Sequence, residues 1–322
     1  MILACRNETR GTAAADDINV SIRAGVAANE ANGEVVEGEV KDVGATQGHA
    51  AFMKLDLASF ASIRAFCAAF EALPGSPALN ILVNNACTVS DKFQQTEDGY
   101  ELMYGVGQIG HFLLTSLLMP KLEAGSVDDS SGHTPFTSRI VILTSTVTVI
   151  SSKDGVLNMP FKSASKYSMM SAYAETKLAN ALFAQELARR SDARGGKVRA
   201  LAVHPGVIET DLSHNMMPKF FFKLVAITKK NTKQGAATST LAAAHPYIDS
   251  LPNGQYFEDC TPKKSSNLVY SKRLAKRVWD NCKAICGIAP YPDTDENAQL
   301  DHVAAPSNPD TPDPTDEMVT SD

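Results

Sequence analysis

Two side chains separated by one helical turn could perform acid–base chemistry in this sequence. Tyr173 and Lys177 are four positions apart, so a helix over this stretch would place them on one face. A cation beside a phenol favours the phenolate and lowers the pKa of the tyrosine from about 10 toward the range that acid–base catalysis needs. This spacing also arises by chance in a chain with 8 tyrosines, but here Ser145 ends the strand predicted just before the helix. Ser145, Tyr173 and Lys177 are therefore candidate catalytic residues.

Alternating apolar strands and helices must position these side chains. The pattern predicts strands at 2–5, 50–56, 79–83, 139–143 and 197–204, with a further strand near 255–257. It predicts helices at 11–29, 59–73, 96–123 and 171–190, and a final helix through Trp279, with Ser59 as an N-cap. Continuous apolar strands that alternate with helices indicate an α/β fold, a doubly wound parallel sheet covered on both faces.

Polar residues follow each predicted strand, at the sheet edge where such folds bind ligands. They are Arg6-Asn7, Asp56, Asn84-Asn85, Thr144-Ser145 and His204-Pro205-Gly206. Any one of them could simply end its strand. Together they predict a polar rim along one edge of the sheet.

A second glycine motif points to packing instead of chemistry. Gly105, Gly107 and Gly110 match G-x-G-x-x-G, but a phosphate loop must follow a strand and open a helix. These glycines interrupt an apolar-periodic helical stretch, so we expect close packing of the helix on the sheet.

Composition excludes several classes of protein. The net charge of −6 argues against a nucleic-acid-binding protein, and no run of about 18 apolar residues predicts a transmembrane helix. The six scattered cysteines predict neither a disulfide framework nor a metal site and favour a reducing, cytoplasmic compartment. Nine acidic residues, no basic residue and six prolines fall within 288–322, so we predict one domain over 1–287 and a disordered acidic, Pro-rich tail over 288–322.

The chain resembles the short-chain dehydrogenase/reductase family, in the branch that holds the retinol dehydrogenases and the WW-domain oxidoreductase. The resemblance covers about residues 1–286 and rests on collinear motifs. They are Ile-Leu-Ala-Cys-Arg-Asn (2–7), Leu-Asp-Leu-Ala-Ser (55–59), Ile-Leu-Val-Asn-Asn-Ala (81–86), Gly-His-Phe-Leu-Leu-Thr (110–115), Ile-Leu-Thr-Ser (142–145), Tyr-Ala-Glu-Thr-Lys-Leu-Ala-Asn (173–180), His-Pro-Gly-Val (204–207) with Thr210, and Gln-Gly-Ala-Ala-Thr (234–238).

This resemblance implies a role for each member of the candidate trio. Tyr173 would be the general acid and base, and Ser145 would hydrogen-bond the substrate carbonyl or hydroxyl. Lys177 would hold the nicotinamide ribose and lower the pKa of Tyr173. The reaction would transfer hydride between a nicotinamide and a carbonyl carbon.

The resemblance also implies a dinucleotide cofactor. Arg6 would suit a 2′-phosphate, so NADP is preferred over NAD. The other cofactor-binding residues would be Asp56 at the adenine, Asn84 at the adjoining ribose, and Pro205, Gly206, Val207 and Thr210 at the nicotinamide side, beside Tyr173 and Lys177.

Three departures from the family pattern stand out. The sequence starts at the family's second strand, without the first strand and its Thr-Gly-x-x-x-Gly-x-Gly turn, so we expect an N-terminally truncated chain whose next two strands lack their neighbour. Cys87 follows Asn-Asn-Ala in place of a glycine and adds a side chain near the cofactor. Gly107 replaces the asparagine that supports a water relay to the lysine in the family.

The resemblance predicts an NAD(P)-dependent oxidoreductase that interconverts an alcohol and a carbonyl. An apolar stretch after Thr210, with Met216, Met217 and three phenylalanines at 220–222, favours a lipophilic substrate or simply packs on the core. The lysines near that stretch leave a weak membrane-surface association open. The alternative is a catalytically impaired remnant that acts as a binding protein.

Overall fold

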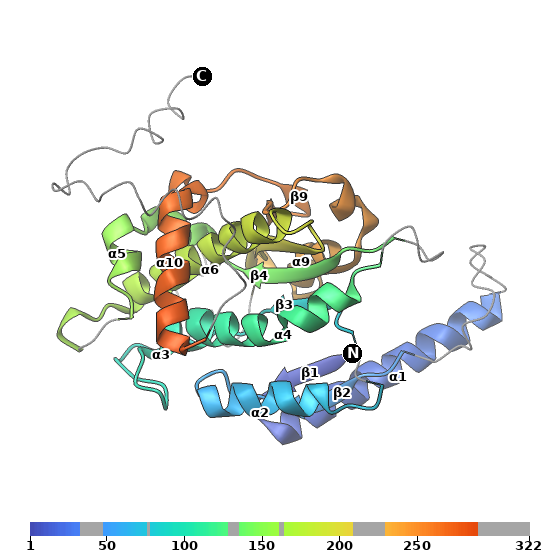
Figure 1. The fold of residues 1–322 in the computed structure, drawn as a ribbon. Coiled ribbons are helices and arrows are strands. Elements are labelled where there is room, and N and C mark those ends of the chain that lie inside the picture. The colour runs from blue at the N-terminus through green and yellow to red at the C-terminus, as the bar shows by residue number, and fades with distance from the viewer. Residues whose placement is uncertain (33–47, 76–77, 128–134, 161–163, 209–228, 289–322) are drawn as a thin grey trace.

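The computed structural model describes residues 1–32, 48–75, 78–127, 135–160, 164–208 and 229–288 (Figure 1). The predicted cofactor residue Thr210, the apolar stretch at 216–222 and nearly all of the acidic tail lie outside the described residues.

A five-stranded sheet forms the centre of the fold. Its strands run in the order β3 (Ile81–Asn84), β4 (Ser138–Leu143), β5 (Val198–His204), β8 (Tyr256–Glu258) and β9 (Thr261–Pro262). The first four strands are parallel, and only β9 is antiparallel to its neighbour. All of β4 and nearly all of β5 are buried, as expected for continuous apolar runs with both faces covered. The predicted α/β fold is confirmed.

Helices cover the two faces of this sheet unequally (Figure 1). The larger core joins α2 (Phe60–Glu71), α4 (His111–Gly125), α6 (Met169–Asp192) and α10 (Lys272–Cys286). At its centre the rings of Phe112, Phe183 and Trp279 lie 5.0–5.8 Å apart. On the other face, α9 (Thr232–Ala244) and the 3₁₀ turn η6 (Pro246–Ser250) cover a smaller core that includes Val141 and Val203. The sheet is therefore doubly wound.

The first two strands form a separate pair. β1 (Ile2–Cys5) is parallel to β2 (Ala51–Lys54), and the long helix α1 (Glu8–Asn32) contacts both. Within the described residues, neither strand is hydrogen-bonded to β3. The side chain of Val83 is 43% exposed although it lies in β3. Among the described residues, no strand therefore joins this pair to the central sheet, as the sequence predicts.

The long helix predicted over 96–123 is wrong at its start. An antiparallel bridge joins Gln95 to Glu101, and the carboxylate of Glu101 then accepts the backbone N–H groups of Met103 and Tyr104. The helix therefore begins at α3 (Leu102–Tyr104), continues as the π-helix η1 (Gly105–Gly110) and passes into α4. A buried carboxylate that caps the new N-terminus explains the change.

The G-x-G-x-x-G motif forms this π-helix, and its glycines allow close packing. A Cβ on Gly107 would lie 2.7 Å from Thr176 Cγ2 of α6, and one on Gly110 would lie 2.6 Å from the Leu57 carbonyl oxygen. The predicted close approach is present, but its partners are a neighbouring helix and a loop instead of the sheet.

The stretch Leu102–Gly125 is, among the described residues, long and apolar enough to cross a membrane by length and composition. However, 78% of its apolar 18-residue window is buried inside the protein, and Ile109, Phe112 and Leu113 belong to the larger core. Its apolar character is thus accounted for by core packing. A short parallel pair, β6 (Val207–Ile208) and β7 (Lys229–Lys230), was not predicted.

Candidate active site

The structure brings the predicted trio together at the carboxyl end of β4. Ser145 follows that strand, and Tyr173 and Lys177 lie on one face of α6. The hydroxyl of Ser145 lies close enough to the Tyr173 phenol to lower its pKa, and Lys177 Nζ lies 5.7 Å from the centroid of the Tyr173 ring. Residues from two elements therefore converge on one phenol.

Lys177 is held by the end of β4. Its side chain is almost fully buried, and Nζ donates to the Leu143 carbonyl over 3.2 Å. The Thr144 hydroxyl donates to the Lys177 carbonyl over 2.7 Å, and the Asn180 amide donates to the Leu143 carbonyl over 2.9 Å. These bonds fix α6 against the strand and set the place of the ammonium.

The pKa of Tyr173 is raised above its ordinary value of 10.0, chiefly because burial disfavours the phenolate. Lys177 lowers this pKa, as the sequence predicts, and so does the hydrogen bond from Ser145. Cys87 raises it. The expectation that the cation prevails is therefore corrected: burial outweighs it in this structure.

Cys87 lies near the Tyr173 phenol. Its thiol donates weakly to the Thr88 carbonyl, with a sulfur–oxygen distance of 3.6 Å, and it acts electrostatically on Tyr173. The cysteine at this turn therefore acts on the candidate acid–base group itself.

The adenine-side candidates follow β1 and β2. Arg6 is exposed, while Asp56 Oδ1 accepts the Ala58 backbone N–H over 2.9 Å. Asn84 is almost fully buried, and its Nδ2 donates to Thr115 Oγ1 over 2.9 Å. Its Oδ1 has no hydrogen-bond partner within the described ranges. The amide of Asn84 thus anchors β3 to α4 and keeps one free acceptor.

A cavity of about 430 Å³ lies beside the ends of β3 and β5. Asn85 and Pro205 line it from the strand ends, and small side chains of α9 line the opposite side. The sequence placed Asn85 only at a strand end. Because alternate residues of a strand point to opposite faces, the burial of Asn84 against α4 could have indicated that Asn85 faces the other side.

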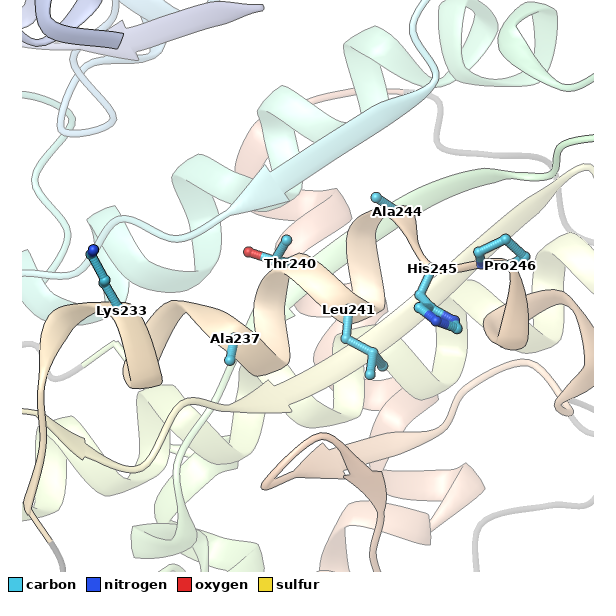
Figure 2. Close-up of a pocket in the computed structure, with 7 residues that line it drawn as sticks. All are labelled: Lys233, Ala237, Thr240, Leu241, Ala244, His245 and Pro246. Carbon is cyan, nitrogen blue, oxygen red and sulfur yellow. The ribbon is translucent and has the colours of Figure 1, made fainter. Parts of the chain in front are cut away.

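A second cavity, of about 480 Å³, runs along α9 (Figure 2). It shares Thr240 and Ala244 with the first cavity and contains none of the predicted site residues. Figure 2 shows Thr240 and Ala244 on one side of the helix and Leu241 on the other.

Three comparisons with known proteins agree. The family described as short chain dehydrogenase matches residues 11–219. The chain belongs to the short-chain dehydrogenase/reductase family.

Retinol dehydrogenase 14 of Mus musculus is 32% identical over 294 residues, which cover 89% of this chain and 78% of that protein. Polyprenol dehydrogenase of Mus musculus is 36% identical over 252 residues, covering 76% and 70%. A crystal structure of NADPH-bound carbonyl reductase from chicken fatty liver shares the fold, with a TM-score of 0.51 and 15% identity over 82% of this chain and 87% of that one.

This short-chain dehydrogenase/reductase is therefore an oxidoreductase of the retinol dehydrogenase-like branch. Its α/β scaffold is the family fold. Within the described residues no group of three His, Cys, Asp or Glu side chains could hold a metal ion.

Gly107 stands where the family resemblance implies an asparagine, so this position has no side chain. The Gly107 carbonyl accepts a hydrogen bond from His111 Nδ1 over 2.9 Å, and Gly107 packs against Thr176. His111 is almost fully buried, and burial lowers its pKa to about 4. A neutral imidazole at the first residue of α4 thus contacts the π-helix η1.

Proposed function

We propose that this oxidoreductase interconverts an alcohol and a carbonyl with a nicotinamide cofactor, and that its substrate is lipophilic. The observation that carries the proposal is that Ser145 and Lys177 both lie close to the phenol of Tyr173. The names of two relatives, a retinol and a polyprenol dehydrogenase, support the lipophilic class.

Each member of the trio has a distinct task in this reaction. In the oxidation direction the Tyr173 phenolate accepts the proton of the substrate hydroxyl, and in the reduction direction the phenol returns it. The Ser145 hydroxyl hydrogen-bonds the substrate oxygen and the phenol oxygen, and so holds the two within reach of one another. Lys177 stabilises the phenolate electrostatically. The bound nicotinamide supplies or accepts the hydride.

The residues of the nicotinamide side fit such a cofactor. The cavity of about 430 Å³ is lined by Asn85, Pro205 and Ile208, next to the end of the strand that leads to Ser145. Asn84 Oδ1, a buried acceptor without a partner in the described part of the chain, lies at the same end of the sheet. Pro205, Gly206 and Val207 would border the nicotinamide, and Lys177 its ribose.

On the adenine side we propose Arg6, Asp56 and Asn84 as the binding residues. Arg6 is an exposed guanidinium just after β1, and a guanidinium fits a phosphate through two parallel hydrogen bonds. We therefore propose NADP in preference to NAD. Replacing Arg6 tests this directly, because the loss of affinity should be larger for NADPH than for NADH.

The test of the whole proposal uses the full chain and its Tyr173→Phe variant. We expect the chain to quench or shift the fluorescence of NADPH on binding and, when supplied with NADP⁺, to oxidise a long-chain or retinoid alcohol. Tyr173→Phe should lower kcat by about 100- to 10,000-fold, because it removes the acid–base group, while nucleotide affinity stays within a factor of about two. Turnover by Tyr173→Phe at the wild-type rate would contradict the proposal.

A binding protein without turnover is the second candidate. Gly107 favours it, because no side chain stands where the family has its relay asparagine, and so does Cys87 beside Tyr173. Nucleotide binding by the wild type without turnover of any alcohol or carbonyl would select this alternative.

A cytoplasmic location, with a weak association to membrane surfaces, is proposed from the sequence. Flotation of the full chain with vesicles of neutral and of anionic lipid measures that association. We expect binding to anionic vesicles that is lost at high salt.

A further inference from the structure

The turn after β5 is fastened by a lysine that is distant in sequence. Lys230 Nζ donates to the Pro205 carbonyl over 3.4 Å and to Asp259 Oδ1 over 2.5 Å. The backbone of Lys230 pairs with Ile208 through the β6–β7 ladder. One residue therefore joins the turn both through its backbone and through its side chain.

The stem of the same lysine covers Gly206. A Cβ added at Gly206 would lie 2.8–2.9 Å from Lys230 Cδ, Cε and Nζ, and Gly206 has a φ of +88°. A residue other than glycine would be strained there and would also displace the lysine. The close packing of Lys230 on the turn thus requires glycine at position 206.

The other end of the ion pair stands on a rigid hairpin. Asp259 and Cys260 both have positive φ, at 50° and 60°, which is the geometry of the tight turn that joins β8 to β9. The Thr238 hydroxyl of α9 accepts the Cys260 backbone N–H over 3.2 Å. The side chain of Asp259 is 58% exposed, and its hydrogen bond with Lys230 lowers its pKa below the ordinary 3.8. Asp259 is thus a charged anchor at neutral pH.

We propose that Lys230, held by Asp259, is a positioning residue that fixes the Pro205–Gly206–Val207 turn against the nicotinamide end of the cofactor. This inference rests on the proposed function, because the turn acquires a ligand only if a nicotinamide binds there. Pro205 and Ile208 line the cavity on either side of the fastened turn, so loosening the turn changes the cavity wall directly. Lys230 lies behind the turn and acts through it.

The test compares Lys230→Met, Lys230→Arg and Asp259→Asn in the full chain. Methionine keeps a long stem over Gly206 but loses the ammonium, whereas arginine keeps the cation. Lys233→Met is the matched control. Lys233 is an exposed lysine three residues after Lys230, and its substitution removes the same charge. The readouts are KM and the dissociation constant for NADPH, kcat at saturating NADPH, and the melting temperature.

We expect Lys230→Met to raise KM and the dissociation constant for NADPH by about tenfold, the effect of one lost charge-assisted hydrogen bond, with kcat within about twofold of wild type. Asp259→Asn should give a smaller rise, Lys230→Arg should restore most of the affinity, and Lys233→Met should leave it unchanged.

Equal nucleotide affinity in wild type and Lys230→Met overturns the positioning role while the proposed function stands. A lower melting temperature with unchanged KM also overturns it, because a merely structural lysine would act that way. If the wild type binds neither NADPH nor NADH, the proposed function fails and this inference fails with it.

Discussion

At the scale of single residues, the state of one proton decides the chemistry at Tyr173. Burial raises the pKa of the phenol, and Lys177 and Ser145 oppose that rise without cancelling it. In such a site the protonated phenol is the stable form at neutral pH, and it is ready to donate. Under the proposed function, the free protein is thus prepared for carbonyl reduction more than for alcohol oxidation.

The raised pKa of Tyr173 predicts different pH profiles for the two directions of the reaction. Oxidation needs the phenolate, so its kcat/KM should rise about tenfold per pH unit from neutral to alkaline pH, whereas reduction should be flat over the same range. Cys87 raises the pKa of Tyr173, so Cys87→Ser should move the rising limb of oxidation to lower pH. Initial rates of the wild type and of Cys87→Ser across that pH range measure the shift. A flat profile for oxidation would contradict the assignment of Tyr173 as the base.

At the scale of elements, the π-helix η1 packs closely on the helix α6 because Gly107 has no side chain. The closest atom to a Cβ on Gly107 is the methyl carbon of Thr176, at 2.7 Å. A substituent at 107 would therefore push against the helix that holds Tyr173 and Lys177.

Gly107→Ala is expected to destabilise the protein by about 1–3 kcal/mol, because it overpacks this contact. Thr176→Ser removes the colliding methyl, so the cost of Gly107→Ala in that background should fall to well under half. Urea unfolding of the four proteins in the cycle measures this coupling.

Gly48→Ala is the matched control, because among the described residues a Cβ there would meet only Ile22, at 3.9 Å, and should change stability little. Additive effects of Gly107→Ala and Thr176→Ser would show that the two residues do not collide.

At the scale of the whole molecule, two buried histidines link stability to pH. Burial lowers the pKa of His111 and of His204 from 6.5 to about 4. Between these values the unfolded chain binds more protons than the folded protein does. The stability is therefore complete above about pH 6.5 and is lost as the pH falls toward 4.

For His111 alone, this linkage lowers the free energy of unfolding by about 2 kcal/mol between pH 7.5 and pH 5. His111→Gln keeps a donor for the Gly107 carbonyl but does not titrate, so it should lose that much less stability over the same interval. Urea unfolding at the two pH values gives the comparison. His49→Gln, at an exposed position, should follow the wild type; identical pH dependence in His111→Gln would refute the linkage.

The order of the elements and the spatial grouping of the candidate trio could be predicted from the sequence, because buried parallel strands are continuous apolar runs and ligand-binding side chains follow their ends. Three features could not. The start of the helix at Leu102 depends on the buried carboxylate of Glu101, the rise in the pKa of Tyr173 depends on burial, and the pairing of Lys230 with Asp259 joins positions 29 residues apart. The first is a local cap by a glutamate, a residue type outside the usual N-cap set. The other two result from tertiary contact, which local pattern does not encode.

The interruption between β1 and β3 has a consequence for how chains meet one another. In the described part of the protein, one edge of each strand carries backbone N–H and C=O groups without a ladder partner, and Val83 stands exposed on β3. An unpaired strand edge is a template on which a strand of another molecule can add. Two copies that meet along β3 would continue the sheet across their boundary, so we expect any self-association at this edge to increase with protein concentration.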